Sequence, residues 1–202
     1  MLPSVQNVFG IVNEDAPPEL LLRMRCDSQS MSFYGDMSRF ISQRIAGFET
    51  LSLLDVGPRT GAGLALLRLL HHPRAFTRLK LHPVAGIDLD PNFNLIADKE
   101  FKDIQALTGN IFGLPEKKFD IVTCSHTIEH LKDVPDFVGQ LEKLARRYVV
   151  IGCPFEEREP MSLGHVQRID QNFMNKLGFF DLEIYESNQF HSGLCCFGLK
   201  TL

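Results

Sequence analysis

Residues 51–70 read LSLLDVGPRTGAGLALLRLL. Residues 51–56 are nearly all apolar, which is typical of a strand buried on both faces of a parallel sheet. A tight turn follows, marked by Gly57, Gly61 and Gly63, and the leucines after it favour a helix packed against that strand. Strand, glycine turn and helix form the first unit of a nucleotide-binding α/β fold, because such a turn lets backbone N–H groups approach a ligand.

The next apolar segment supports this interpretation, which a glycine turn alone would not establish. Residues 84–90 read VAGIDLD and end in acidic side chains. Asp88 follows Gly63 at close to the roughly 20-residue offset at which an acidic residue, at the end of the second strand, receives a ribose diol. Two carboxylate oxygens can accept from two neighbouring hydroxyls, so Asp88 is the predicted ribose ligand.

Three segments, at residues 53–63, 86–90 and 119–133, resemble motifs of the class I S-adenosylmethionine-dependent methyltransferases. LLDVGPRTGAG (53–63) resembles their first motif, GIDLD (86–90) their second, and FDIVTCSHTIEHLKD (119–133) the fourth strand and following turn of the small-molecule branch. The resemblance runs from about residue 51 to the C-terminus. It implies S-adenosylmethionine as cofactor and a Rossmann-like, doubly wound α/β sheet of seven strands, mostly parallel with an antiparallel strand in a C-terminal hairpin.

One position departs from the family. The family reads D-x-G-x-G-x-G, whereas this chain has Asp55, Gly57, Arg59 and Gly61, so that an arginine replaces the middle glycine. We therefore expect the loop to approach the cofactor differently at this point. The departure leaves open a second reading, a non-catalytic binding protein that keeps the cofactor fold.

The resemblance assigns the cofactor to residues at the ends of successive strands. Asn110 stands where the family often carries an aspartate that binds the adenine amino group, and an amide oxygen can accept the same bond. Ile111 lies either against the adenine face or simply on the sheet. Asp55 either reaches the methionine ammonium through water or braces the glycine loop. The complete predicted set is Asp55, Gly57, Arg59, Gly61, Gly63, Asp88, Leu89, Asn110, Ile111 and Ser125.

Methyl transfer from a sulfonium is an in-line displacement, so the protein must mainly align the reacting groups and exclude water. A hydroxyl acceptor would benefit from a base, and His126, directly after the fourth strand, is the first candidate. A structural histidine is the alternative, because many small-molecule methyltransferases use no dedicated base. His130 and His165 are weaker candidates. The charged loop Glu156–Arg168 is a candidate specificity segment, and solvated charges are the plainer reading of it.

No metal site is predicted. His126–His130 spells H-x-x-E-H, the inverted zinc-peptidase pattern, but nothing downstream offers an obvious third ligand. The pair His71 and His72 is explained by a solvated loop. Five cysteines without a C-x-x-C pair indicate neither a disulfide framework nor a thiolate zinc site, and a reducing cytoplasm is the expected location.

The 202 residues fit one domain, with residues 1–50 as a helical cap or arm of the methyltransferase domain at 51–202. A net charge of −4 with scattered basic residues gives no nucleic-acid footprint. No apolar run approaches the 18 or so residues that span a bilayer. The expected partner is a small-molecule acceptor, and a homodimer is left open. A nucleotide-dependent oxidoreductase is a third reading, but too few residues remain for its separate substrate domain.

Periodicity and turn residues predict the remaining elements. One or two helices are expected within 19–47 and a loop over 71–82. The later helices and strands are expected in alternation, ending in a hairpin. Helices are predicted at 91–102, 134–147 and 171–177, and strands at 84–90, 104–107, 119–124, 148–152, 181–185 and 195–200.

Overall fold

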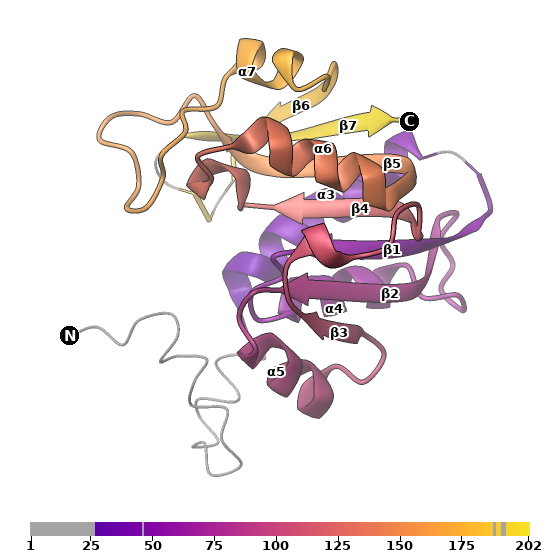
Figure 1. The fold of residues 1–202 in the computed structure, drawn as a ribbon. Helices are drawn as coiled ribbons and strands as arrows, with labels where there is room; N and C mark the ends of the chain where they lie inside the picture. Colours follow the sequence, from indigo (N-terminus) through magenta and orange to yellow (C-terminus); the bar gives the residue numbers. More distant parts are fainter. Residues whose placement is uncertain (1–26, 46, 188, 191–192) are drawn as a thin grey trace. The chain divides into compact units, whose positions relative to one another are not determined.

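The computed structural model describes residues 27–45, 47–187, 189–190 and 193–202 (Figure 1). The chain divides into two compact units, Met1–Gly113 and Leu114–Leu202, which are described in turn. The arm predicted at the N-terminus, and any helix beginning near Glu19, lie outside the described residues.

The first unit is a parallel sheet with a helix in each connection. Its strands pair in the order β3-β2-β1, and β1 is buried from its second residue onward, as the apolar run predicts. Helix α3 packs on α4, and α5 packs on β3. The elements are α3 (Ser28–Arg44), β1 (Thr50–Val56), α4 (Ala62–Leu70), β2 (Lys80–Asp88), α5 (Asn92–Glu100), β3 (Gln105–Thr108) and the 3-10 turn η1 (Ile111–Gly113).

Strand β2 begins earlier than the sequence indicates. Lys80 and Leu81 already pair with Thr50 and Leu51, and the register shifts before Leu53. Leu81 is fully buried, so its burial and its pairing with β1 extend the strand into residues 71–82, where the sequence predicts a loop.

His71 is buried at the end of α4, so the solvated loop predicted for it is wrong, and it links this helix to two neighbours. Its Nδ1 lies 3.0 Å from the carbonyl oxygen of Leu79, so that Nδ1 carries the proton and donates. Its Nε2 then accepts from the Ser38 hydroxyl at 2.9 Å. Burial lowers the pKa of His71, and the positive charge of Lys80 lowers it further. The hydrogen bond to the Leu79 carbonyl raises the pKa but does not outweigh burial. The folded protein therefore holds this imidazole neutral.

We expect the stabilising contribution of His71 to be lost as the pH falls below about 6.5. Its folded pKa is below the unfolded value near 6.5, so the contribution is present above that value and is lost as pH falls towards the folded pKa. Thermal unfolding of the wild type and of His71→Gln should show a difference in melting temperature that is largest near pH 8 and shrinks below pH 6.5. A difference that stays constant between pH 8 and pH 5 would contradict this assignment.

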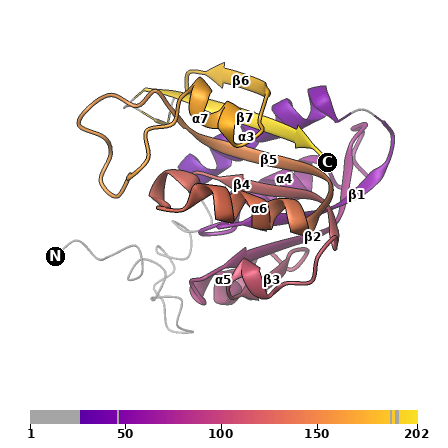
Figure 2. The same cartoon turned by 45° about the horizontal axis from the view of Figure 1, so that its top comes forward.

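The second unit continues with strands that pair in the order β4-β5-β7-β6. Strands β4 and β5 are parallel, whereas β7 is antiparallel to both β5 and β6, as expected for the C-terminal hairpin (Figure 2). Helix α6 packs across β4 and β5. The elements are β4 (Phe119–Ser125), η2 (Ile128–His130), α6 (Val134–Leu144), β5 (Ala145–Phe155), α7 (Gln171–Lys176), β6 (Asp181–Tyr185) and β7 (Leu194–Thr201).

The boundary between α6 and β5 differs from the prediction. The helix ends at Leu144 and the strand begins at the next residue, so Arg146 and Arg147 lie in the strand and not at a helix terminus. Ala145 pairs with Phe119, and the Arg146 side chain donates to Asp120 at 2.9 Å. Sheet pairing thus overrides a helical pattern that the sequence would otherwise continue.

Candidate functional site

The loop after β1 has the left-handed backbone that its glycines allow. Gly57 and Gly61 have φ values of 76° and 79°. Arg59, between them, has a φ of 57°, a conformation that glycine adopts readily and other residues rarely do. The arginine therefore takes a left-handed backbone conformation that a glycine at this position would adopt readily.

The side chain of Arg59 is directed to the start of α3. Its Nη1 donates to the Gln29 side-chain oxygen at 3.1 Å, and its Nε lies 4.0 Å from Asp27 Oδ2. Asp27 caps α3 through the Ser30 N–H at 3.2 Å and also accepts from the Thr60 hydroxyl at 2.9 Å. These contacts tie the loop to α3 through the carboxylate of Asp27.

We expect Arg59→Gly to bind cofactor as the wild type does, within about threefold. Glycine relieves an αL conformation that costs of order 1 kcal/mol, and the half-exposed ion pair that is lost contributes a similar or smaller amount. Arg59→Val should instead lose stability, because a β-branched residue resists a positive φ. Calorimetric titration with S-adenosylhomocysteine and thermal unfolding of both variants would test this. A tenfold or greater gain in affinity for Arg59→Gly would mean that the arginine obstructs the site.

Asp55 is fully buried at the end of β1 and accepts a hydrogen bond from the Tyr34 hydroxyl of α3. The same tyrosine ring lies over Gly63, where an added Cβ would come within 2.4 Å of it. This environment favours the bracing role among the two that the sequence leaves open for Asp55.

Asp88 lies at the C-terminal end of β2, where the sequence places it. Its two oxygens accept from different segments, Oδ2 from the Arg59 N–H at 3.1 Å and Oδ1 from the Asp90 N–H at 3.0 Å. Burial raises the pKa of Asp88, and these hydrogen bonds oppose the rise. A carboxylate has about four acceptor positions, so Asp88 keeps acceptor capacity for the hydroxyls of a diol.

The adenine candidates differ in exposure. Asn110, after β3, is exposed, and its Oδ1 accepts from the Phe112 N–H at 3.1 Å. Ile111 is only 5% exposed, which favours packing on the sheet over contact with a base. Leu89 is 73% exposed and Phe112 49% exposed. Phe112 belongs to none of the predicted motifs, although its place two residues after Asn110 is the signal that could have identified it.

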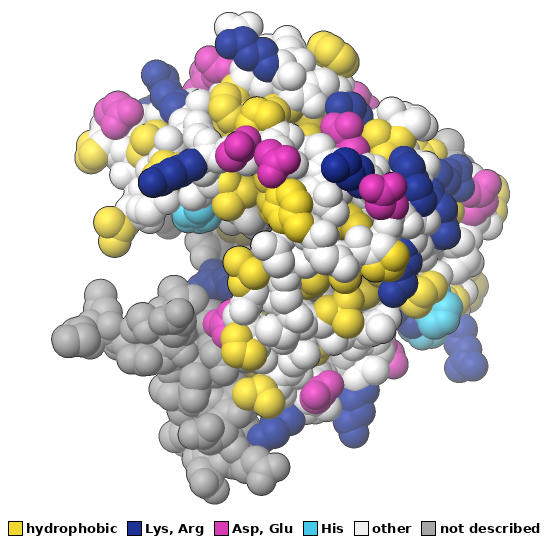
Figure 3. Space-filling model, viewed as in Figure 1, with side chains coloured by type: hydrophobic (Ala, Val, Ile, Leu, Met, Phe, Trp, Pro, Cys, Tyr) yellow, Lys and Arg dark blue, Asp and Glu magenta, His cyan; other side chains and the backbone are white. Residues whose placement is uncertain are grey.

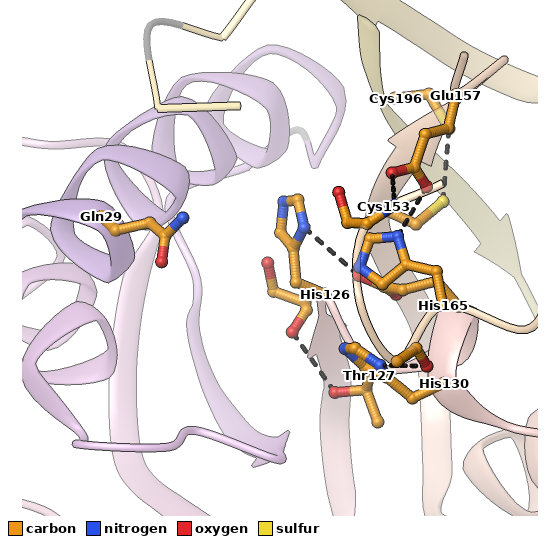
Figure 4. Close-up of polar contacts among 12 residues, drawn as sticks. Gln29, His126, Thr127, His130, Cys153, Glu157, His165 and Cys196 are labelled. Atoms are coloured by element: carbon orange, nitrogen blue, oxygen red, sulfur yellow. Dashed lines mark hydrogen bonds and ion pairs between the residues drawn. The ribbon is translucent and has the colours of Figure 1, made fainter. Parts of the chain in front are cut away.

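In the second unit, β4 ends at Ser125, and His126 follows it directly. The Ser125 hydroxyl is buried and has no hydrogen-bond partner among the described residues. His126 has a φ of 52°, and its N–H donates to the Gly152 carbonyl at 2.8 Å. Its Nδ1 lies 3.4 Å from Glu129 Oε1, and its ring is 18% exposed (Figure 4). The positive φ of His126 thus turns the chain out of the extended conformation of β4 at this residue.

The structure brings His165 from the segment 156–168 to His130. The two rings meet edge to face with centroids 4.9 Å apart (Figure 4). His165 Nδ1 lies 2.6 Å from Glu157 Oε2, and the Ser162 N–H donates to the other oxygen of Glu157 at 2.6 Å. Burial raises the pKa of Glu157, but the hydrogen bonds from Ser162 and His165 outweigh it and hold the pKa below its usual range.

A cavity of about 360 Å³ opens beside the same segment. It combines charged side chains with one aromatic ring. Its lining includes Glu156, Arg158, Glu186, Ser187 and Phe190.

Comparison with known proteins identifies the family. The model of a methyltransferase domain family matches residues 31–181, and the chain belongs to this family. No curated protein matches the chain. The cofactor that this fold and family imply is S-adenosylmethionine.

Solved methyltransferases share the fold at low sequence identity. A SAM-dependent methyltransferase from Aquifex aeolicus has 16% identity and a TM-score of 0.61, over 92% of this chain and 98% of that one. The CurJ carbon methyltransferase has 11% identity and a TM-score of 0.66, over 96% and 60%. The CMeT domain of the citrinin polyketide synthase has 14% identity and a TM-score of 0.65, over 98% and 59%. The chain thus spans about 60% of the last two, and it has the seven-stranded, mostly parallel Rossmann-like fold of methyltransferases.

Two further properties of the described residues concern the charges on one face and the apolar character of the helices. On the face shown in Figure 3, basic side chains are interspersed with acidic and apolar ones. Within the described part of the chain, every helix falls short of the length and apolar character that a bilayer crossing demands.

Proposed function

We propose that this chain transfers a methyl group from S-adenosylmethionine to a small-molecule acceptor, of which a glycan-type molecule is one class. The single observation that carries the proposal is the arrangement at Asp88. A half-buried carboxylate at the end of β2 is fixed by the N–H groups of Arg59 and Asp90, so it is oriented before a ligand arrives.

The residues of the first unit suit the cofactor. Asp88 has acceptor positions for the ribose hydroxyls, and the positive φ values at Gly57, Arg59 and Gly61 turn the loop without a helical or extended backbone. Asn110 and the exposed Leu89 supply a polar group and an apolar face for an adenine. When bound, S-adenosylmethionine would supply a methyl group on a positively charged sulfur, which is already an activated leaving group.

The acceptor class is proposed from the cavity beside the segment 156–168. Carboxylates of Glu156 and Glu186 can accept from hydroxyls, Arg158 can donate, and the ring of Phe190 offers an apolar face. This combination suits a small polyhydroxylated molecule. His126 is proposed as the base that removes a proton from an acceptor hydroxyl.

The first experiment is calorimetric titration of the protein with S-adenosylhomocysteine, with NAD as the control ligand. Micromolar binding of S-adenosylhomocysteine and no binding of NAD are expected. Binding of NAD instead would favour the oxidoreductase reading, and binding of neither would contradict the proposal.

The second experiment separates catalysis from binding. The protein is incubated with S-adenosylmethionine carrying a labelled methyl group and a panel of simple sugars and phenols, and transfer of the label is measured. His126→Asn should lower kcat by about 10²- to 10⁴-fold and leave the affinity for S-adenosylhomocysteine unchanged. An unchanged kcat would assign His126 a structural role, and binding without any transfer would favour the non-catalytic reading.

A further inference from the structure

Three potential metal ligands gather in the second unit at the turn after β4. One ligand atom from each of Glu129, His130 and His165 lies within 4.8 Å of the other two. Two histidines and a glutamate are the protein ligands of one class of catalytic zinc site. The H-x-x-E-H pattern alone predicts no metal, because it lacks a third ligand nearby in the sequence. In the folded chain His165, 35 residues beyond His130, supplies that ligand.

Glu129 is a buried carboxylate whose surroundings suit a cation. The residue is 1% exposed, and neither carboxylate oxygen has a hydrogen-bond partner among the described residues. Its nearest basic neighbour is His126, whose Nδ1 lies 3.4 Å from Oε1. A buried carboxylate without hydrogen bonds is costly, and coordination to a cation is one of the few ways to compensate it.

The two histidines are held in the tautomer that a metal requires. His130 Nδ1 lies 3.0 Å from the carbonyl oxygen of Gly164, and His165 Nδ1 lies 2.6 Å from the Glu157 carboxylate (Figure 4). Both acceptors lack a proton to give, so each Nδ1 donates and each Nε2 keeps its lone pair. A ligating histidine typically donates its other N–H to a carbonyl or a carboxylate in this way.

The backbone brings these side chains together independently of any ion. The Glu129 carbonyl accepts from the N–H groups of Val166 and Gln167, at 2.8 and 3.2 Å. The Gln167 side chain donates to the Leu131 carbonyl at 2.9 Å. The turn that carries Glu129 and His130 is therefore fastened to the residues that follow His165.

We propose that Glu129, His130 and His165 bind a divalent transition-metal ion. Zn²⁺ suits the ligand set, because imidazole and carboxylate are its usual nitrogen and oxygen ligands. Three protein ligands leave a fourth position open to water or to an oxygen of a small molecule. None of the three ligands belongs to the predicted cofactor-binding set, so the test of metal binding does not depend on methyl transfer.

The test is titration of metal-stripped protein with Zn²⁺, followed by calorimetry and by thermal unfolding. The wild type is expected to bind one ion per chain and to gain melting temperature as Zn²⁺ increases. Glu129→Gln and His165→Gln should each lose more than about 100-fold in affinity. Glu157→Gln, which removes only the partner of His165, should lose about 10- to 100-fold.

Two further readouts make the result specific. Glu129→Gln should melt higher than the wild type in the presence of a chelator, because it removes an uncompensated buried charge, and should gain nothing from Zn²⁺. Titration with Co²⁺ should give the visible bands of nitrogen and oxygen coordination without a thiolate charge-transfer band. The exposed His82 provides the control, since His82→Gln should bind Zn²⁺ as the wild type does.

The proposal fails if the wild type binds no Zn²⁺, or if Glu129→Gln and His165→Gln bind it as tightly as the wild type does. It also fails if the Co²⁺ spectrum shows thiolate coordination. Cofactor binding measured on the same samples reports separately on the first unit.

Discussion

Replacing Asp88 by alanine is expected to weaken the binding of S-adenosylhomocysteine by at least about 100-fold. The carboxylate would accept from two ribose hydroxyls, and a hydrogen bond to a charged group contributes about 1.5–3 kcal/mol. The variant also loses the acceptor that fixes the Arg59 N–H, so the glycine loop is no longer held to the end of β2. Calorimetry with S-adenosylhomocysteine measures the loss directly.

Asp90→Ala is the matched control for this prediction. Asp90 lies two residues further on and meets Asp88 through its backbone N–H, which alanine retains. We expect its affinity to stay within about threefold of the wild type. If Asp88→Ala bound as tightly as Asp90→Ala, Asp88 would not be the ribose ligand.

The same carboxylate predicts a pH dependence of binding. Because burial raises the pKa of Asp88, the group takes up a proton at a higher pH than an exposed aspartate does. A protonated carboxyl accepts hydroxyl hydrogen bonds poorly. Affinity should therefore fall as the pH is lowered towards that raised pKa, and this fall should be absent in Asp88→Asn.

Gly63→Ala is expected to destabilise the protein by about 2–3 kcal/mol, which corresponds to a fall in melting temperature of roughly 5–10 °C. An added Cβ would lie 2.4 Å from the ring of Tyr34 and 2.9 Å from the Ser30 carbonyl oxygen. Relief of this overlap requires α3 to move away from α4 and strains the hydrogen bond from Tyr34 to Asp55. Thermal unfolding would measure the effect.

Two other helical glycines provide controls of opposite sign. Gly35 in α3 and Gly139 in α6 have no atom within 4 Å of an added Cβ. Alanine is more favourable than glycine inside a helix by up to about 1 kcal/mol, so both variants should melt a few degrees higher. A similar loss of stability at Gly35, Gly63 and Gly139 would mean that close packing of α3 on α4 is not the cause.

The sequence predicts the first unit well because its signals are local. The apolar run before Gly57, and the acidic end of β2 at Asp88, are read from neighbouring residues and appear where they are expected. The family and the fold that these local motifs predict are confirmed by the family model and by the solved methyltransferases. Arg59 shows what the motif could not predict, because this non-glycine residue has a positive φ, which glycine adopts readily.

The sequence could not predict contacts that depend on distant segments. His165 meets His130 only because the backbone of residues 166–167 bonds to the carbonyl of Glu129, and no periodicity records such a bond. The early end of α6 also depends on a distant segment, because Ala145 pairs with Phe119 in the sheet and so belongs to β5. Local propensity competes with tertiary pairing at both places, and the pairing prevails.

The direct passage from α6 into β5 has a consequence for changes of chain length. Leu144 ends the helix and Ala145 begins the strand, so no connecting residue can absorb an insertion. One added residue at this junction would have to be taken up by the strand, and a shift of one position would exchange its two faces. Inserted tags or loops therefore belong elsewhere in the chain, and homologous proteins that differ in length are expected to keep this junction unchanged.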